Sequence, residues 1–370
     1  MKEFAIHTKI VNVDTFVAFA EQKQLTKKDL IITNEFIYEP FMKSCNVPCK
    51  FIFQEKYGSG EPSDQMIDAI RKDIPSDVTR VIAVGGGTVI DIAKVLTFVG
   101  EWATEEIFTG KIVPKKERGL IVIPTTCGTG SEVTNITIAE LKNLKTKKGL
   151  ALESMYPDEA VLIPEMIKTL PYKFFATSSI DAMIHAVESY LSPKATAHSE
   201  EFSISAINKI IHGYKYVVEN GQTNWIDKAK EFLVASNYAG IAFGNAGCAA
   251  VHALSYPLGG MYHIPHGEAN MLMFAAVLKK YKEKKAVGKL NELEKLFADA
   301  LEVKEEEGLV ALYDLMEKIL SRKPLREYGI KEEELAMFSA SVIEGQQRLL
   351  NNNYVELTEA EMTEIYKRCF

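Results

Sequence analysis

One carboxylate and three imidazoles, spaced so that they could share a metal ion, are the residues of this chain best suited to chemistry. Asp181 and His185 lie four positions apart in the helix-favouring segment SSIDAMIHAVESY, so their side chains project from one helical face. His252 and His266 follow, and four residues between them can break the chain and fold it back: Pro257, Gly259, Gly260 and Pro265. Three histidines and an aspartate suit Fe²⁺, Zn²⁺, Co²⁺ or Mn²⁺. The alternative, a closed structural zinc site, usually employs cysteines.

Length and composition predict a globular enzyme with two domains. The 370 residues exceed one compact core of ordinary size, and 47% hydrophobic with 25% charged residues is typical of a globular chain. A net charge of −7 favours a small-molecule partner and argues against nucleic acid or an acidic membrane surface. The chain has no signal-peptide pattern, no bilayer-spanning apolar run and an odd number of cysteines. We therefore expect a cytoplasmic protein that does not associate with membranes.

The hydrophobic pattern changes near residue 171. Before it, short β-branched runs alternate with helical patterns, which predicts a parallel sheet covered on both faces. The predicted strands cover residues 29–34, 49–54, 80–86, 119–126 and 160–164, and Ser63 is the predicted N-cap of a helix over 63–74. After it, helical periodicity dominates. We expect an α/β domain over 1–170 and an all-helical domain over 171–370.

A glycine turn between a predicted strand and a predicted helix is a candidate phosphate site. The strand RVIAV is followed by three glycines and a threonine, of which Gly86, Gly87 and Thr88 lead into the helix VIDIAKVLTF. Glycines let a diphosphate approach the backbone, and the helix N-terminus favours negative charge. The turn is neither the usual dinucleotide fingerprint nor a Walker loop, and a tight structural turn would look similar.

A second loop, over residues 124–132, is rich in hydroxyl groups and follows the next predicted strand. Its candidate contacts with a ribose or nicotinamide are Thr125, Thr126, Thr129 and Ser131. Hydroxyl-rich loops are often only turn and cap structures. Two such loops after consecutive strands would nevertheless meet at the carboxyl edge of the sheet, where ligands bind.

Five motifs together resemble the iron-containing (group III) alcohol dehydrogenase family: GGGTVIDIAK, IPTTCGTGSEVT, SSIDAMIHAVESY, HALSYPLGG and IPHGEAN. The resemblance spans nearly the whole chain. It implies a Rossmann-like dinucleotide-binding domain joined to an all-α metal domain, as in dehydroquinate synthase. It also implies that Asp181, His185, His252 and His266 bind iron as a Lewis acid, although zinc could take its place, and that NAD accepts a hydride.

The resemblance also assigns cofactor contacts. It places the diphosphate on the glycine turn, Asp91 at the family's cofactor-side aspartate, and Lys148 on a neighbouring hairpin that reaches the dinucleotide. Many NAD-preferring members have Asp where this chain has Asn34, followed here by Glu35. Asn34 weakens the exclusion of a 2′-phosphate and Glu35 can restore it, so NAD is the expected cofactor.

Two positions depart from the family pattern. Many relatives carry His four residues after the His252 equivalent, where a proton relay is proposed, and this chain has Tyr256. Many have Asp where this chain has His263. Tyr256 and His263 are therefore the candidate relay residues, and a structural tyrosine and a solvated histidine are the alternatives.

Within the family, several segments are similar to the members that interconvert 4-hydroxybutyrate and succinate semialdehyde. Such a substrate has a terminal carboxylate and needs a cation, for which four residues are candidates: Arg322, Lys323, Arg326 and Arg348. Relatives are commonly dimers or larger. The alternatives are a dehydrogenase of butanol, 1,2-propanediol or lactaldehyde, a lyase of the dehydroquinate synthase type, whose metal is bound by one Glu and two His, and a non-catalytic sensor.

Overall fold

A computed structural model describes residues 3–285 and 287–370, which form two compact units. The first unit is Ile6–Leu170, and the second is Pro171–Phe370 together with the N-terminal residues up to Ala5. The backbone N–H of Ala5 donates to Oδ1 of Asn245 at 2.9 Å, which attaches this terminal segment to the helical unit.

The first unit contains a six-stranded sheet in which every pair of strands is parallel, in the order β1-β8-β5-β4-β2-β3. Its strands are β1 (Lys9–Asn12), β2 (Asp29–Thr33), β3 (Lys50–Phe53), β4 (Arg80–Gly85), β5 (Gly119–Pro124) and β8 (Glu159–Leu162). The five predicted strands are confirmed. The first strand escaped prediction because it is a short edge strand, exposed at both ends, without a continuous apolar run.

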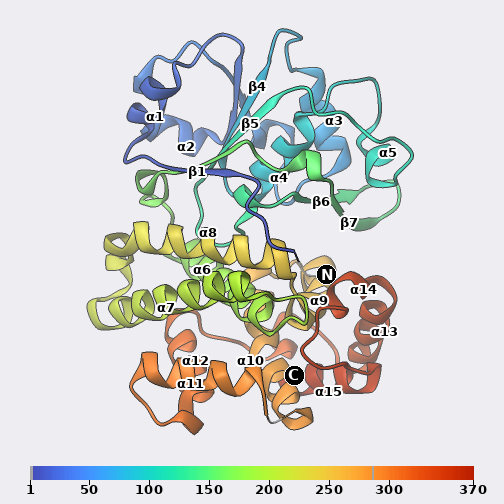
Figure 1. Cartoon of the computed structure of the whole chain (residues 1–370). Coiled ribbons are helices and arrows are strands. Elements are labelled where there is room, and N and C mark those ends of the chain that lie inside the picture. The colour runs from blue at the N-terminus through green and yellow to red at the C-terminus, as the bar shows by residue number, and fades with distance from the viewer. Residues whose placement is uncertain (1–2, 286) are drawn as a thin grey trace. The chain divides into compact units, whose positions relative to one another are not determined.

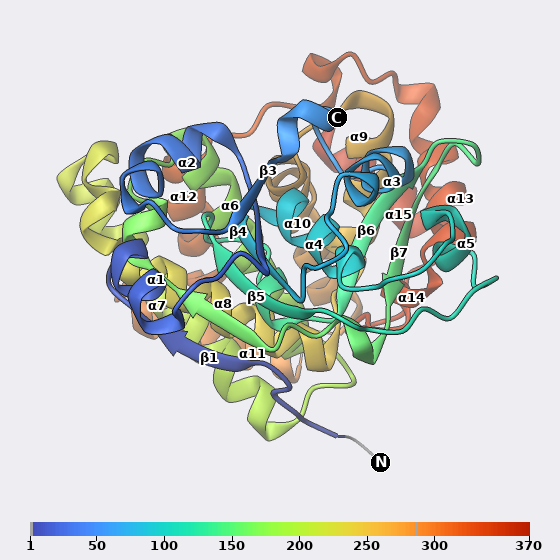
Figure 2. The same cartoon turned by 90° about the horizontal axis from the view of Figure 1, so that it is seen from above.

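Helices cover both faces of this sheet, and each face has its own apolar core (Figures 1 and 2). One core contains residues of α3 (Asp64–Lys72), α4 (Gly87–Leu96) and α5 (Thr104–Phe108). The other contains residues of α1 (Phe16–Lys23) and α2 (Glu35–Phe41). β2 and β4 supply alternate residues to the two cores, which explains why their sequences are apolar throughout. The hydroxyl of Ser63 accepts the N–H of Met66, as the predicted N-cap requires.

A separate antiparallel hairpin, β6 (Ile136–Leu141) and β7 (Thr146–Ala151), follows the hydroxyl-rich loop and packs on α4 and α5. Its second strand is almost entirely exposed. Because that strand has little apolar periodicity, no strand was predicted there from the hydrophobic pattern.

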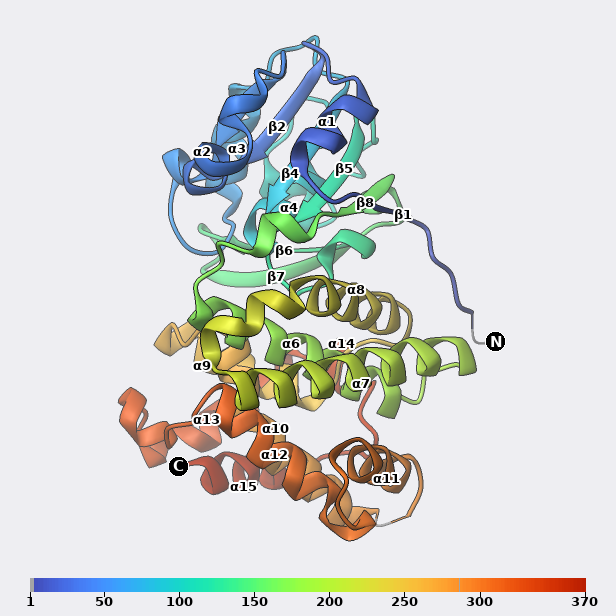
Figure 3. The same ribbon diagram turned by 90° about the vertical axis from the view of Figure 1, so that its left-hand side faces the viewer.

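The second unit is helical, and its first three helices, α6, α7 and α8, pack against one another (Figure 3). Its helices are α6 (Tyr172–Leu191), α7 (Ala197–Asn220), α8 (Ala229–Ala246), α9 (Ala250–Tyr262), α10 (His266–Lys284), α11 (Lys289–Leu301), α12 (Gly308–Ile319), α13 (Leu335–Gly345), α14 (Gln347–Leu350) and α15 (Glu359–Cys369). Among the described residues, no helix combines the length and the apolar character needed to cross a membrane. The predicted fold class, an α/β unit followed by an all-helical one, is confirmed.

The chain reverses at a different place from the one predicted between the second pair of histidines. Pro257, Gly259 and Gly260 all lie inside α9, so they do not break the chain. The reversal occurs at His263, which has φ 54°, and at Pro265. A proline inside a helix removes one backbone hydrogen bond, but burial of neighbouring α9 side chains such as Leu258 offsets that loss.

Candidate metal centre and nucleotide-binding edge

Asp181 and His185 lie one turn apart on α6, which is buried over most of its length. Both side chains are buried, and Nδ1 of His185 lies 3.8 Å from Oδ2 of Asp181. Burial alone would raise the pKa of Asp181, but the neighbouring histidines lower it far below its usual range. The helix therefore presents an ionised carboxylate beside an imidazole.

His252 and His266 approach the same carboxylate from the first turns of α9 and α10. Nε2 of His252 lies 3.5 Å from Oδ1 of Asp181, and Nε2 of His266 lies 3.6 Å from that oxygen. Two ligands about 2.1 Å from a tetrahedral ion are about 3.4 Å apart, so these separations suit ligands of one ion. Asp181, His252 and His266 thus form one candidate triad.

The buried carboxylate of Glu188, which was not predicted from the sequence, contacts the ring nitrogen of His252 that faces away from Asp181. Its Oε2 lies 2.6 Å from Nδ1 of His252, and its oxygens also accept the N–H groups of Ala249 and Val251. Because Nδ1 is the donor in this contact, Nε2 is left as the ligand nitrogen that faces Asp181. The only signal in the sequence was a second carboxylate on the helix of Asp181, three residues after His185 in the motif HAVESY.

Asn270 is a second residue that sequence reasoning missed. It is fully buried on α10, and its Nδ2 donates to Oδ1 of Asp181 at 2.8 Å while lying 3.3 Å from Nε2 of His266. It sits one helical turn after His266, in the motif HGEAN. The amide therefore fixes the orientation of the carboxylate that the histidines share.

Cys248, a buried free cysteine, also lies at this centre. Its sulfur forms a second candidate triad with ligand atoms of His185 and His252, all within 4.8 Å of one another. Burial, and then the charges of Glu188 and Asp181, raise the pKa of Cys248 well above its ordinary value. In the carboxylate triad, two imidazole nitrogens lie 3.5 and 3.6 Å from one oxygen of Asp181, so we take it as the better metal set.

In the α/β unit, the two predicted loops lie at the carboxyl ends of the neighbouring strands β4 and β5. A Cβ added to Gly86 would lie 3.3 Å from Cγ2 of Thr126, and one added to Gly87 would lie 3.1 Å from Cγ2 of Thr129. A side chain at Gly87 would therefore require Thr129 to move by a few tenths of an ångström. Gly86 is the N-cap of α4 and no side chain caps it, so the helix N-terminus is available to an anion.

The hydroxyl-rich loop is attached to α4 by a buried network. Oδ1 of Asp91 accepts from Ser131 Oγ at 2.9 Å, and Oδ2 accepts the N–H of Ile138 at 2.9 Å. Lys94 Nζ donates to Ser131 Oγ at 2.7 Å and to the carbonyl of Ile136 at 2.6 Å. Asp91 and Ser131, both expected to contact cofactor, are thus used to hold the loop in place.

At the end of β2, Asn34 is held by a glutamate that the sequence did not single out. Nδ2 of Asn34 donates to Oε2 of Glu55 at 2.8 Å, and the N–H of Glu35 donates to the other oxygen at 2.5 Å. Glu55 follows β3, the neighbour of β2, and no motif marks it. This edge therefore carries the charge of Glu55 beside Asn34 and Glu35.

Comparison with known proteins gives the family. The family model described as "Iron-containing alcohol dehydrogenase" matches residues 13–164, and that described as "Fe-containing alcohol dehydrogenase family, C-terminal" matches residues 175–370. The chain is 51% identical to the 4-hydroxybutyrate dehydrogenase of Clostridium kluyveri over 371 residues, which cover all of both chains. This chain belongs to the iron-containing alcohol dehydrogenase family.

One further relative and one solved structure are also similar to this iron-containing alcohol dehydrogenase. The long-chain-alcohol dehydrogenase 1 of Geobacillus thermodenitrificans is 34% identical over 301 residues, which are 78% of this chain and 74% of that protein. The structure of sulfoacetaldehyde reductase from Bifidobacterium kashiwanohense in complex with NAD⁺ has a TM-score of 0.87 at 21% identity, with 100% of this chain and 98% of that chain covered. That likeness concerns the fold.

The remaining residues that were expected at the site of this iron-containing alcohol dehydrogenase lie partly near the metal ligands and partly at the surface. The Tyr256 ring lies 6.2 Å from the His266 ring and is half-buried. His263 is exposed at the end of α9 and, within the described chain, makes no hydrogen bond or ring contact with the four candidate ligands. In the first unit, the hydroxyl of Thr88 donates to the carbonyl of Gly60 at 3.3 Å, and the exposed Lys148 lies on β7.

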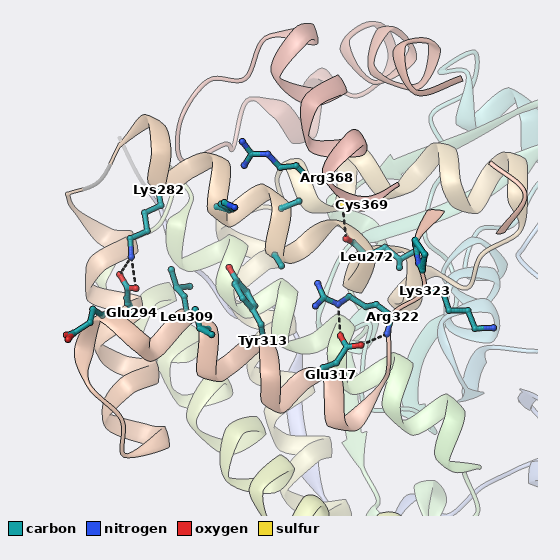
Figure 4. A pocket seen from close by; sticks show the side chains of 16 residues that line it. Leu272, Lys282, Glu294, Leu309, Tyr313, Glu317, Arg322, Lys323, Arg368 and Cys369 are labelled. Carbon is teal, nitrogen blue, oxygen red and sulfur yellow. Dashed lines mark hydrogen bonds and ion pairs between the residues drawn. The ribbon is translucent and has the colours of Figure 1, made fainter. Parts of the chain in front are cut away.

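Two of the four candidate cations line a groove of about 860 Å³ between α10, α12 and α15, shown in Figure 4. Nε of Arg322 donates there to Oε2 of Glu317 at 2.6 Å, and Lys323 lies beside it. None of the four candidate metal ligands is among the described residues that line this groove. Arg326 is also engaged, because it donates to the carbonyl of Phe370 at 2.7 Å.

Proposed function

We propose that this iron-containing alcohol dehydrogenase interconverts 4-hydroxybutyrate and succinate semialdehyde with NAD. The reaction class is supported above all by one observation: two imidazole nitrogens lie 3.5 and 3.6 Å from the same oxygen of Asp181. The choice of substrate is supported by the full-length identity of 51% with the enzyme of Clostridium kluyveri. Family membership and ligand chemistry support iron, although zinc suits the same donors.

Four residues of the helical unit would hold the ion: Asp181, His185, His252 and His266. A ferrous ion bound there would supply Lewis acidity, which favours ionisation of an alcohol and polarisation of a carbonyl. Glu188 keeps the proton on Nδ1 of His252, and Asn270 holds the orientation of Asp181. These two residues make the ligand set rigid before any substrate binds.

In the oxidative direction, bound NAD⁺ would supply a hydride acceptor for the carbinol carbon of 4-hydroxybutyrate, and the hydroxyl would lose a proton. The products are succinate semialdehyde, NADH and H⁺. Tyr256 is the better candidate to pass that proton to solvent, because its ring lies 6.2 Å from His266 and is half-buried. His263 is fully on the surface, so we assign it no step.

NAD would bind along the carboxyl ends of β5, β4 and β2, which are neighbours in the sheet. The glycine turn and the first turn of α4 would take the diphosphate. Thr125, Thr126, Thr129 and Lys148 remain proposed contacts with the dinucleotide, whereas Asp91 and Ser131 would act by holding the loop. Asn34 and Glu35, with Glu55, would face the adenosine ribose.

Anaerobic purification with ferrous iron, followed by NADH absorbance, tests this proposal directly. We expect turnover of 4-hydroxybutyrate to exceed that of 1-butanol and 1,2-propanediol. A preference for a neutral alcohol would support the alternative that the long-chain-alcohol relative suggests. Inactivity of the iron-loaded protein with every alcohol, with either NAD or NADP, would refute the proposal.

We further propose a cytoplasmic protein that forms a homodimer or a larger assembly. Light scattering coupled to size-exclusion chromatography measures the mass directly. A mass of one chain, at 41.3 kDa, would exclude the assembly.

A further inference from the structure

We infer that Arg348 binds the terminal carboxylate of the substrate and thereby selects 4-hydroxybutyrate over neutral alcohols. The inference rests on the proposed function and goes beyond it, because it assigns the charge recognition to one side chain.

Arg348 lies on the short helix α14, which packs against α9, the helix that carries His252. Asn352 joins the two elements, because its buried Nδ2 donates to the carbonyl of Cys248 at 2.8 Å and to that of Arg348 at 3.2 Å. The sulfur of Cys248 is in turn grouped within 4.8 Å with ligand atoms of His185 and His252. One amide therefore fixes the backbone of Arg348 to the wall of the metal centre.

The guanidinium of Arg348 is available, in contrast to those of the neighbouring arginines. Arg348 is exposed, and its side chain forms no hydrogen bond or ion pair with any residue that the structure describes. Arg322 is paired with Glu317, and Arg326 with the carbonyl of Phe370, while Arg368 contacts Glu283. Of the arginine and lysine candidates for the carboxylate, Arg348 thus combines an uncommitted charge with a backbone tied to the metal centre.

The positive charge of Arg348 belongs to a helix whose backbone is tied to Cys248 of the centre through Asn352. Two buried carboxylates, Asp181 and Glu188, belong to the centre, and their charge would repel an anionic substrate. A cation on this side compensates for that repulsion.

The chemistry of the substrate fits recognition by an arginine. Only two methylene groups separate the carbinol carbon of 4-hydroxybutyrate from its carboxyl carbon. A carboxylate can accept two parallel hydrogen bonds from a guanidinium, which a terminal hydroxyl or methyl group cannot do. The arginine would therefore discriminate between substrates of the same chain length.

The test compares 4-hydroxybutyrate with 1,4-butanediol, in which a neutral CH₂OH replaces the carboxylate, in the iron-loaded full-length protein. For Arg348→Ala, we expect the ratio of the two kcat/KM values to fall about 10- to 100-fold, mainly through a higher KM for the acid. Arg348→Lys should recover part of the ratio, because it keeps the charge and loses the bidentate geometry. Arg322→Ala, in the groove of Figure 4, is the matched control and should keep the wild-type ratio.

A purely structural role of Arg348 would lower both kcat/KM values together and leave their ratio unchanged. That result, or the same loss of ratio in Arg322→Ala, would overturn the inference. Failure of the proposed function gives a different result, since the wild-type protein itself would then prefer the diol. A wild type that prefers the acid and an Arg348→Ala variant that keeps this preference would reject the inference alone.

Discussion

Oε2 of Glu188 lies 2.6 Å from Nδ1 of His252, so a buried carboxylate behind the metal centre determines which imidazole nitrogen can bind a metal. The same side chain accepts two backbone N–H groups at the start of α9. Glu188 therefore couples the position of a ligand to the position of the helix that carries it.

Replacement of Glu188 by glutamine should weaken iron binding and lower kcat/KM, each by about 10- to 100-fold. The amide keeps the size of the side chain but no longer holds the proton on Nδ1 of His252 by charge. Iron content after dialysis against a chelator of known affinity measures the first effect. The control is Glu294→Gln, a buried glutamate paired with Lys282 in the same unit. Equal iron retention in both variants would argue against a role for Glu188 in ligand positioning.

Replacement of Tyr256 by phenylalanine should lower kcat about 100-fold if its hydroxyl passes the proton. The solvent deuterium isotope effect on kcat should rise, because proton transfer then limits turnover. Tyr262→Phe is the control, since Tyr262 lies on the same helix and its hydroxyl donates to Glu334 at 2.6 Å. If Tyr256→Phe keeps the wild-type kcat and isotope effect, the ring serves packing only.

Replacement of Glu55 by glutamine should make the enzyme more tolerant of NADP. Its carboxylate accepts from Asn34 and Glu35 at the predicted ribose site, where a negative charge repels a 2′-phosphate. We expect the ratio of kcat/KM for NAD⁺ to that for NADP⁺ to fall about 5- to 10-fold. Glu39→Gln removes an exposed charge of the same unit and should leave the ratio alone. An unaltered ratio in the Glu55 variant would exclude this role.

Lys94 should make the stability of the α/β unit depend on pH. Burial lowers its pKa to about 8, against 10.5 for the ordinary lysine, although Asp91 and Glu132 raise it. Between about pH 8 and 10.5, the unfolded chain therefore holds more protons than the folded one, and the free energy of unfolding rises with pH. The increase in the free energy of unfolding, relative to that of Lys94→Met, should be on the order of 3 kcal/mol across this pH range and absent below pH 8.

Urea unfolding of the wild type and Lys94→Met at several pH values measures this difference. Lys142→Met, which removes an exposed lysine paired with Glu140, is the control, and its difference from the wild type should be flat. A wild-type advantage over Lys94→Met that is constant or decreases from pH 8 to 10.5 would contradict the expected protonation of Lys94.

The sequence predicted the sheet well because β2, β4 and β5 are buried on both faces and are therefore apolar throughout. It predicted β1, β6 and β7 poorly: β1 is short, β7 is almost entirely exposed, and β6 buries only alternate residues, so none of them has a continuous apolar run. The four ligand candidates could be predicted because two lie at helical spacing and all are of metal-binding types. The structure places His252 and His266 beside one oxygen of Asp181, and it groups the fourth candidate, His185, with Cys248 and His252.

The residues behind the site could not be predicted in the same way. Glu188 and Asn270 act on ligands from other helices, and Glu55 acts on Asn34 from a neighbouring strand, so their partners are set by packing alone. Pro257 and the glycines beside it were wrongly predicted to break the chain, because the packing of α9 outweighs local preference. The chemistry of the site could be predicted from the sequence, but the contacts that support its ligands could not.

The three hydrogen bonds that Glu188 accepts also bear on how the protein acquires its metal. They satisfy the first turn of α9 with partners from the polypeptide itself, so that turn does not depend on an ion to keep its shape. We expect iron-starved cells to accumulate folded apoprotein. When iron returns, this apoprotein should become active as soon as iron binds, without synthesis of new protein.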